Sequence, residues 1–335
     1  MKAMILKQPG RIENNPLREV EINRPQPAPG EVLLKVEACG VCHTDLHTAE
    51  GEIELPKLPV IPGHQIVGIV KETGEKVKGL NTGERVGVTW FHSSCGECEY
   101  CQQGLENLCD KARFTGLHAD GGYAEYTSIP ADYVFAIPEQ FSSIQAAPLL
   151  CAGVIGYRSL RLSEIKPGQK LGLYGFGSSA HVCIQIARYR GCEVYVFTRS
   201  KEHREHARKL GAVWAGGAED EPPEKMDSSI IFAPAGWIVP EALRVLMKGG
   251  TVAINAIHMS PIPEFNYKLI YYEKTVRSVA NLTVRDAREF LKLAAEIPVK
   301  TDVEVFPLRE VNKVLKMVKN SSIKGSAVLK IGDNF

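Results

Sequence analysis

Four cysteines are clustered in one short stretch in the first third of the chain. They follow the spacing C-x2-C-x2-C-x7-C, at Cys95, Cys98, Cys101 and Cys109. Four thiolates this close together can fill every position of a tetrahedral Zn²⁺, which makes a closed, structural site. In the competing bacterial iron–sulfur pattern the fourth cysteine follows after three residues and precedes Pro, whereas here it follows after seven and precedes Asp110. The spacing predicts a structural zinc lobe at about residues 92–112.

Three other residues are of the types that hold a catalytic zinc, namely Cys42, His64 and Cys151. A catalytic zinc needs three protein ligands and one open position, and two Cys with one His is a standard set. Two thiolates cancel the 2+ charge of the metal. The spacing alone does not join these three residues, because a cysteine beside Ala152 and Gly153 is more often a small buried apolar residue.

A glycine-rich segment lies in the middle of the chain. It is a G-x-G-x-x-A string, and it follows an apolar run at residues 170–174 and precedes a helical pattern at residues 178–190. In that context the glycines allow a tight turn that brings a pyrophosphate close to the N-terminus of the helix, where free N–H groups favour anions. We therefore expect a dinucleotide to be bound by Gly175, Gly177, Ser178, Ser179 and Ala180.

The choice between NAD and NADP is set near the end of the second strand of such a fold. An NAD-selective site has a carboxylate there, which holds the ribose 2′-OH. This chain instead has Thr198 followed by Arg199, and a hydroxyl with a guanidinium can accept a 2′-phosphate. The sequence favours NADP(H), with NAD(H) as the alternative if Arg199 is only a solvated residue.

The elements that must position these residues follow two different sequence patterns. The first 150 residues contain brief β-branched runs between Pro and Gly, which indicates an irregular, mostly antiparallel β domain. From about residue 153, apolar strands alternate with helical stretches, the rhythm of a doubly wound parallel sheet. A helix is expected at residues 239–247, another near residues 309–319, and a last strand at residues 327–331. The predicted α/β organisation is a β-rich domain at residues 1–152, a Rossmann domain at residues 153–284 and a C-terminal segment at residues 285–335.

The composition excludes several classes of protein. The 335 residues carry 40 basic and 39 acidic side chains, a net charge of +1, so binding of nucleic acid or anionic membranes through bulk charge is not expected. No apolar run reaches the roughly 20 residues that span a bilayer, and the first residues do not resemble a secretory signal. The nine cysteines are an odd number, which is a poor disulfide framework. A cytoplasmic protein is expected.

The motifs taken together resemble a known family. The segments Gly40-Val41-Cys42-His43-Thr44-Asp45-Leu46-His47, Pro62-Gly63-His64, the four-cysteine loop and Leu150-Cys151-Ala152-Gly153 are similar to the zinc-containing alcohol dehydrogenases of the medium-chain dehydrogenase/reductase superfamily. The resemblance extends over essentially the whole chain. It implies a GroES-like catalytic domain and a Rossmann domain, two zinc ions per chain, and catalytic ligands at Cys42, His64 and Cys151.

The same resemblance implies roles for the neighbours of these ligands. Asp45 supports His64 from behind, as carboxylates behind metal ligands commonly do. A hydroxyl at Thr44 hydrogen-bonds the substrate oxygen, and the proton then passes through the cofactor ribose to His47 and on to solvent, while zinc stabilises the alkoxide. The family usually has Glu where this chain has Gln65, and the loss of that negative charge should lower the pKa of a bound alcohol.

The resemblance also places Trp90 in the substrate pocket, where an aromatic side chain would suit small primary alcohols and their aldehydes. The predicted activity is reversible hydride transfer between such a substrate and the cofactor. A polyol dehydrogenase or an NADP-dependent aldehyde reductase of the same superfamily is the enzymatic alternative, and a zinc-stapled redox-sensing or binding protein the non-enzymatic one. Similar proteins are homodimers or homotetramers, usually in contact near residues 275–279.

Overall fold

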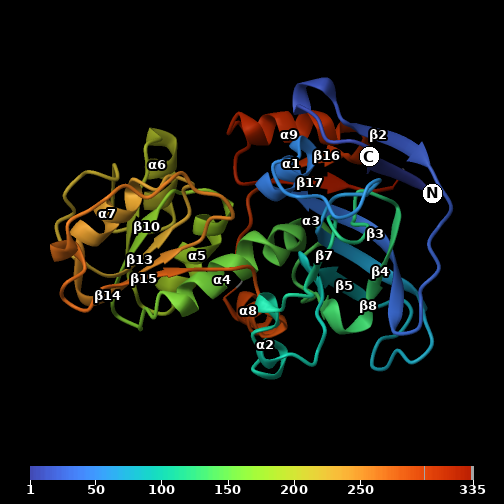
Figure 1. Ribbon diagram of the computed structural model, residues 1–335, viewed down its shortest axis with the longest axis horizontal. Coiled ribbons are helices and arrows are strands. Elements are labelled where there is room, and N and C mark those ends of the chain that lie inside the picture. Colours follow the sequence, from blue (N-terminus) through green and yellow to red (C-terminus); the bar gives the residue numbers. More distant parts are fainter. Residues whose placement is uncertain (298, 333–335) are drawn as a thin grey trace. The chain divides into compact units, whose positions relative to one another are not determined.

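The computed structural model describes residues 1–297 and 299–332, which form two compact units (Figure 1). The first unit comprises Met1–Cys151, Leu282–Ala295 and the segment from Lys300 onward. The second comprises Ala152–Asn281 with the short stretch Glu296–Val299. Both ends of the sequence therefore build the first unit.

A seven-stranded sheet forms the centre of the first unit. Its strand order is β16-β17-β3-β4-β5-β9, and β8 pairs with β3. All pairs are antiparallel except β16 with β17, which confirms the predicted β-rich domain. Two small sheets, β1-β2 and β6-β7, complete the strands of this unit. The strands are β1 Lys2–Leu6, β2 Leu17–Glu21, β3 Glu31–Val41, β4 Gln65–Thr73, β5 Arg85–Val88, β6 Phe91–Ser93, β7 Arg113–Phe114, β8 Tyr126–Pro130, β9 Val134–Ala136, β16 Val303–Pro307 and β17 Ser326–Lys330.

Helices of four to thirteen residues also belong to this unit. One of them, α1, packs beside α9 and is held at its C-terminal end by Lys319, whose Nζ lies 2.8 Å from Glu50 and 3.0 Å from Glu13. This anchoring matters because α1 follows Cys42 directly. The helices are α1 His43–Glu50, α2 Glu99–Gln102, α3 Ser143–Ala146, α8 Val284–Glu296 and α9 Val311–Lys319, with 3-10 turns η1 Ile12–Asn14, η2 Glu106–Leu108, η3 Ala131–Tyr133, η4 Ala147–Leu150 and η6 Leu308–Glu310.

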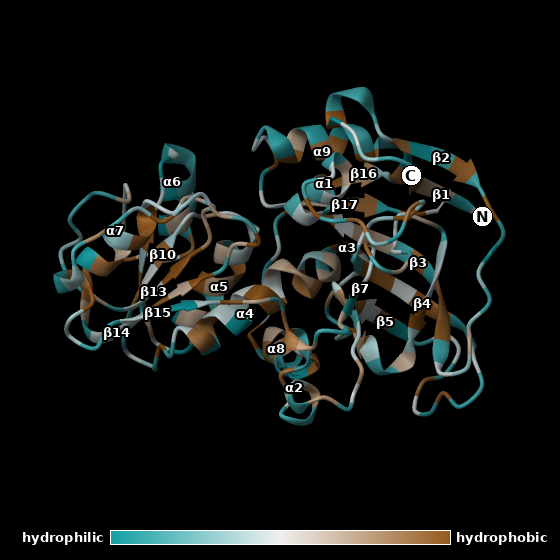
Figure 2. Ribbon diagram, in the orientation of Figure 1, coloured by the Kyte–Doolittle hydropathy of each residue, from teal (hydrophilic) through white to brown (hydrophobic). Residues whose placement is uncertain are grey.

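The second unit is built on a six-stranded parallel sheet of order β12-β11-β10-β13-β14-β15. Its inner strands are apolar over most of their length (Figure 2), as strands covered on both faces must be. This is the predicted Rossmann arrangement. The elements are β10 Lys170–Tyr174, β11 Glu193–Phe197, β12 Trp214–Gly216, β13 Met226–Ile231, β14 Leu246–Ile254 and β15 Thr275–Ser278, with α4 Ala152–Leu162, α5 Ser178–Tyr189, α6 Lys201–Lys209, α7 Ile238–Arg244 and η5 Tyr267–Leu269.

The structure differs from the sequence prediction at the helix expected over residues 239–247. That helix is α7, which ends at Arg244, and β14 begins two residues later at Leu246. Leu246 pairs with Met226 of β13, and both side chains are buried. A short apolar run fits either period, so the pairing with β13 decides the outcome.

Two helices next to the candidate ligands were not predicted. Helix α1 is only eight residues long and mostly polar, so it gives no apolar period. Helix α4 begins directly after Cys151 and contains Gly156. A Cβ at Gly156 would lie 3.1 Å from the carbonyl oxygen of Ser179, so the missing side chain lets α4 approach α5 closely.

Among the described residues, no helix has both the length and the apolar character that crossing a bilayer requires.

Candidate metal and cofactor sites

The first unit brings Cys42, His64 and Cys151 together from three separate places. Cys42 follows β3 and caps α1, His64 precedes β4, and Cys151 follows η4. The antiparallel pairing of β3 with β4 sets Gly40 opposite Gln65, which brings the first two ligands side by side. Their donor atoms and that of Cys151 all lie within 4.8 Å of one another, and Cys42 Sγ is 3.6 Å from His64 Nε2.

The electrostatics of this cluster favour a bound cation. A hydrogen bond with Cys151, followed by burial, raises the pKa of the Cys42 thiol well above its usual value. Burial lowers the pKa of His64, but the charges of Asp45 and Cys42 and their hydrogen bonds outweigh it and raise that pKa to about 10. A divalent cation favours the deprotonated forms of the Cys42 thiol and the His64 imidazole, so both would release a proton on binding it. The donor set therefore fits a zinc ion with three protein ligands.

Asp45 contacts two of the three ligand residues. One carboxylate oxygen lies 3.2 Å from His64 Nδ1, and the other accepts the backbone N–H of Cys42 at 2.9 Å. This directs Nε2 of His64 toward the cysteines. The side chain of Gln65 is buried and packs against Gly40, whose missing Cβ leaves room for the amide. The residue at this position is therefore neutral and closely packed.

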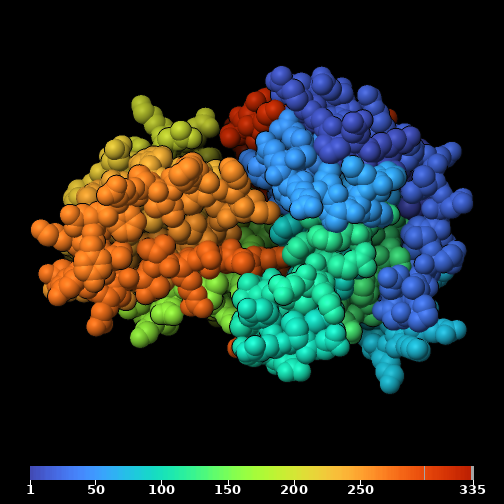
Figure 3. Space-filling model, viewed as in Figure 1, coloured from blue at the N-terminus to red at the C-terminus, as the bar shows by residue number. Residues whose placement is uncertain are grey.

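The four-cysteine loop forms a second cluster. The sulfur atoms of Cys95 and Cys101 are 3.9 Å apart, those of Cys98 and Cys101 3.5 Å, and those of Cys109 and Cys95 3.5 Å. Four ligands at the usual Zn–S distance would be separated by about 3.8 Å, so the loop already has the required size. Hydrogen bonds from backbone N–H groups lower the pKa of Cys95 to about 6. This loop, with α2, stands at the surface of the first unit (Figure 3).

Helix α1 positions Thr44 and His47 three residues apart, and thus on neighbouring parts of one face. The structure pairs His47 Nδ1 with the carboxylate of Glu52, a residue that the sequence reasoning did not include. The backbone N–H of Glu52 also donates to the carbonyl of His47 at 2.9 Å. Gly51, at φ 77°, makes the turn that allows both contacts. The sequence did contain one indication of this contact, namely an acidic residue directly after the glycine that ends the helix.

Aromatic side chains flank His64. The ring of Trp90 lies 6.2 Å from the imidazole of His64, between centroids, so Trp90 is beside the candidate metal site. Phe114 stacks on Trp90 at 4.4 Å. The sequence reasoning missed Phe114, which comes shortly after Cys109 and pairs with Phe91 in the small β6-β7 sheet. An aromatic wall thus borders this side of the site.

In the second unit, the predicted phosphate loop joins β10 to α5. Gly175 has a φ of 88°, and a Cβ there would lie 3.2 Å from the backbone nitrogen of Ala233. Gly177 caps α5, and Ser178, Ser179 and Ala180 form its first turn. The first turn of a twelve-residue helix offers free N–H groups to an anion. The geometry fits the pyrophosphate of a dinucleotide.

The end of β11 carries the two residues predicted to read the ribose. Thr198 is buried, and its N–H donates to the carbonyl of Gly216 at 2.8 Å. Arg199 is exposed. Arg204, from α6, donates through Nε to the carbonyl of Thr198 at 2.8 Å and so fixes this turn. No carboxylate occurs within residues 198–201.

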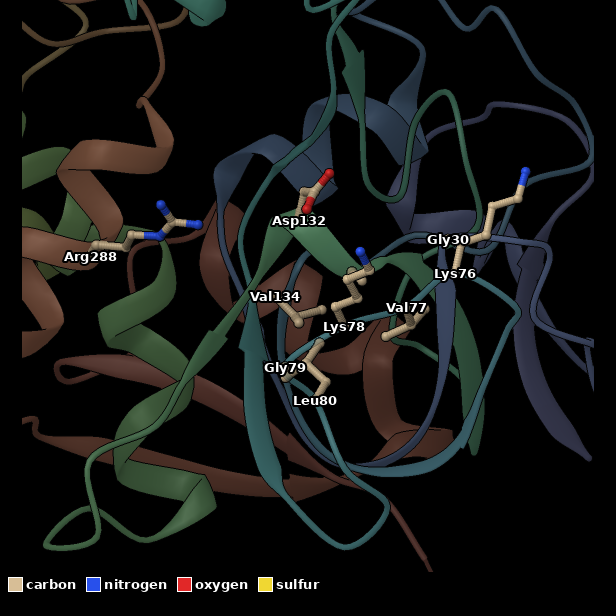
Figure 4. Close-up of a pocket in the computed structure, with 10 residues that line it drawn as sticks. Gly30, Lys76, Val77, Lys78, Gly79, Leu80, Asp132, Val134 and Arg288 are labelled. Carbon is tan, nitrogen blue, oxygen red and sulfur yellow. The ribbon is translucent and has the colours of Figure 1, made fainter.

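A separate hollow of about 420 Å³ lies in the first unit, between the β4–β5 connection, η3 and α8 (Figure 4). Lys78 and Arg288 contribute positive charge to it, and Asp132 contributes a carboxylate. In the close-up Arg288 reaches toward the hollow from α8, while Lys76 extends away from it. None of the candidate metal, relay or cofactor residues lines this hollow.

Comparisons with known proteins agree with this geometry. Residues 28–139 match the family model described as alcohol dehydrogenase GroES-like domain, and residues 180–296 match the one described as zinc-binding dehydrogenase. The chain is 44% identical to a probable alcohol dehydrogenase, AdhA, of Mycobacterium tuberculosis, over 99% of this chain and 97% of the relative. It is 38% identical to an alcohol dehydrogenase of Geobacillus stearothermophilus, over 94% and 95% of the two chains.

Solved structures show the same fold. A cinnamyl alcohol dehydrogenase of Sorghum bicolor has a TM-score of 0.90 at 28% identity, covering 98% of this chain and 97% of that one. An acetophenone reductase of Geotrichum candidum, solved in complex with NAD, has a TM-score of 0.86 at 25% identity, covering 98% and 96%. The chain belongs to the zinc-type alcohol dehydrogenases of the medium-chain dehydrogenase/reductase superfamily, and it is an oxidoreductase that uses zinc and a nicotinamide cofactor.

Proposed function

We propose that this alcohol dehydrogenase transfers a hydride reversibly between small primary alcohols or their aldehydes and the cofactor, at a zinc held by Cys42, His64 and Cys151. The observation that carries the proposal is the convergence of these three donor atoms within 4.8 Å. When bound there, zinc supplies a Lewis acid that polarises the substrate oxygen. Three protein ligands leave one position of a tetrahedral ion for that oxygen.

The residues of α1 handle the proton of the alcohol. Thr44 contacts the substrate hydroxyl and orients it, and His47 holds the departing proton before it reaches solvent. With its Nδ1 proton directed at Glu52, His47 presents Nε2 as the acceptor. A base with a fixed tautomer and an exposed partner is suited to exchange protons with water.

Trp90 and Phe114 restrict the substrate. Their stacked rings stand beside His64, so a substrate oxygen at the metal would lie close to an aromatic wall. Such a wall accommodates a small alkyl chain and excludes branching near the reacting carbon. Small primary alcohols and aldehydes are therefore the proposed substrates.

Two zinc ions per chain are proposed, one in each cluster. Metal analysis should find two zinc ions in the wild type and one in Cys151→Ser, with activity lost and the fold retained. As a matched control, Cys98→Ser should also lose one zinc, but with destabilisation of the lobe, because closed zinc sites contribute to folding. An active Cys151→Ser variant, assayed with a panel of alcohols and aldehydes by nicotinamide absorbance, would contradict the proposal.

NADP(H) is the proposed cofactor, with NAD(H) as the alternative. The support is the pair Thr198 and Arg199 at the end of β11, where a basic side chain is present and a carboxylate is not. The 2′-phosphate of NADP is attracted by a guanidinium. A comparison of kcat/KM for NADPH and NADH tests this choice directly.

A homo-oligomer, a homodimer or homotetramer, is proposed to form through β15. All four residues of this edge strand are exposed, and Tyr271 and Tyr272 are exposed just before it. An exposed edge strand has unpaired backbone N–H and C=O groups with which another strand can pair. Val276→Lys should reduce the mass measured by sedimentation, whereas Val305→Lys, on the edge strand β16, should not. An unchanged mass in Val276→Lys would contradict this interface.

The cytoplasm is the proposed location. All nine cysteines lie among the described residues and none is paired in a disulfide, as is typical of proteins in a reducing compartment.

A further inference from the structure

An asparagine follows β14 at the same edge of the parallel sheet as the phosphate loop. The register sets Tyr174, Ile231 and Ile254 in one row, and these residues end β10, β13 and β14. The phosphate loop begins after Tyr174, and Asn255 comes directly after Ile254. The backbone N–H of Asn255 donates to the carbonyl of Ile231 at 2.8 Å. Asn255 therefore lies at the carboxyl ends of the strands, outside which such sheets bind their ligands.

The strand order places this asparagine in one half of the dinucleotide site. In the order β12-β11-β10-β13-β14-β15, the sequence of strands reverses between β10 and β13. A dinucleotide binds across that point, with its pyrophosphate at the first strand–helix turn and its adenosine ribose at the end of the second strand. Those positions are the phosphate loop after β10 and Thr198 after β11. The nicotinamide half therefore falls on the side of β13 and β14, where Asn255 is two strand spacings, about 10 Å, from the loop.

A chain of hydrogen bonds fixes the orientation of the Asn255 amide. Ser159 is fully buried on α4, and its hydroxyl donates to the carbonyl of Ile155 at 2.7 Å. Because a hydroxyl has only one proton, Ser159 Oγ accepts from Asn255 Nδ2, which lies 2.8 Å away. The same nitrogen is 3.5 Å from the Ile155 carbonyl, which can only accept. The amide nitrogen therefore faces α4, and Oδ1 is the atom left to meet a ligand.

The oxygen of this amide is available as an acceptor. Oδ1 of Asn255 accepts no hydrogen bond from any residue that the structure describes, and the side chain is only partly buried. The nicotinamide ring carries a carboxamide, whose nitrogen offers two N–H donors like that of an asparagine side chain. An acceptor that is already held in one orientation loses little further freedom when it binds such a donor.

We propose that Asn255 is a cofactor-binding residue, whose Oδ1 accepts a hydrogen bond from the carboxamide of the nicotinamide ring. Ser159 is the positioning residue that turns the amide toward this donor. A held carboxamide selects one of the two orientations of the ring about its bond to the ribose, and with it the face that exchanges the hydride. The inference rests on the proposed use of NADP(H) or NAD(H), and all three residues of the hydrogen-bond chain belong to the second unit.

The test measures by titration calorimetry the binding of NADP⁺ and of two related ligands. ADP-ribose 2′-phosphate lacks the nicotinamide ring, and the acetylpyridine analogue of NADP⁺ has an acetyl group without N–H in place of the carboxamide. In Asn255→Ala the affinity for NADP⁺ should fall about two- to tenfold, the usual effect of one hydrogen bond, and the affinities for the other two ligands should stay constant. The corresponding ligands without the 2′-phosphate give the same comparison for NAD⁺.

Two further variants separate this role from packing. Ser159→Ala removes the group that orients the amide, so it should cause a smaller loss that is again confined to NADP⁺, and an unchanged affinity would overturn the role of Ser159. Asn266→Ala is the matched control in the same unit. Its side chain accepts only the nearby N–H of Lys268, at 2.9 Å among the described contacts, so its removal should change none of the affinities. Equal losses for all three ligands in Asn255→Ala, or no loss for NADP⁺, would overturn the inference.

A crystal structure of the wild type with NADP⁺ tests the same point without a variant. Oδ1 of Asn255 should lie within about 3.0 Å of the carboxamide nitrogen, and a separation beyond hydrogen-bond distance would overturn the inference. Failure of the dinucleotide site itself is distinguishable, because the wild type would then bind none of the three ligands. Failure of the proposed dehydrogenase activity would leave the order of affinities intact and would appear only in the alcohol assay.

Discussion

The choice of cofactor depends on one exposed side chain, Arg199, at the end of β11. Replacement of Arg199 by Ala removes one guanidinium from the place where a 2′-phosphate would lie. A hydrogen bond to a charged group contributes about 1.5–3 kcal/mol. Because Arg199 is exposed and screened by solvent, the lower value applies. It corresponds to about a tenfold loss of kcat/KM with NADPH. The reaction with NADH should not change, since it makes no use of this charge.

Initial rates with NADPH and NADH, measured at fixed alcohol and low ionic strength, give the two kcat/KM values. We expect the NADPH value to fall about tenfold in Arg199→Ala and the NADH value to stay constant. Lys209→Ala removes the same charge from the far end of α6 and controls for bulk electrostatics. Thr198→Asp should lower the NADPH value further and raise the NADH value, because a carboxylate repels the phosphate and binds the 2′-OH. Equal losses with both cofactors in Arg199→Ala would refute this reasoning.

Three further predictions concern protons. In His47→Gln, turnover at neutral pH should fall and be partly rescued by alkaline buffer, and an unchanged rate would dismiss the relay. In Gln65→Glu, an added negative charge opposes ionisation of the bound alcohol, so the pH–rate profile should move upward; a profile that stays in place would contradict this. Burial, followed by the charge of Arg113, lowers the pKa of His92 to about 4. Between pH 6.5 and 4 the unfolded chain then binds more protons than the folded one. The free energy of unfolding should therefore decrease as the pH is lowered through that window, by up to about 3 kcal/mol. Thermal melts of His92→Gln should show a weaker fall than the wild type, and parallel curves would exclude His92 as the cause.

The parts of the molecule that could be predicted from the sequence are those in which the residues of a motif are also neighbours along the chain. The four cysteines lie in one loop, and the two glycines of the phosphate loop lie between a strand and a helix that they join. In both cases the spacing along the sequence is enough to place the residues close together in the structure. The division into a β-rich unit and a parallel sheet follows from the change of periodicity near residue 153.

The contacts that could not be predicted depend on long-range pairing. Nothing local indicates that Cys151 lies near Cys42, because this depends on the β3–β4 register and on the packing of η4 against the same sheet. Only the family resemblance suggested this set, and its metal-binding role stays a prediction. Phe114 was missed for the same reason, since it reaches Trp90 beside the candidate site through the pairing of β6 with β7.

Helix α1 explains why several functional side chains occur in one continuous motif. Cys42 caps the helix, and Asp45, three residues later, accepts the Cys42 N–H as a normal capping residue would. The other oxygen of that carboxylate contacts His64. The same side chain therefore serves as a local folding signal and contacts a ligand of the candidate metal site. Substitution of Asp45 must affect the start of α1 as well as the ligand, and with it the direction in which Thr44 and His47 point.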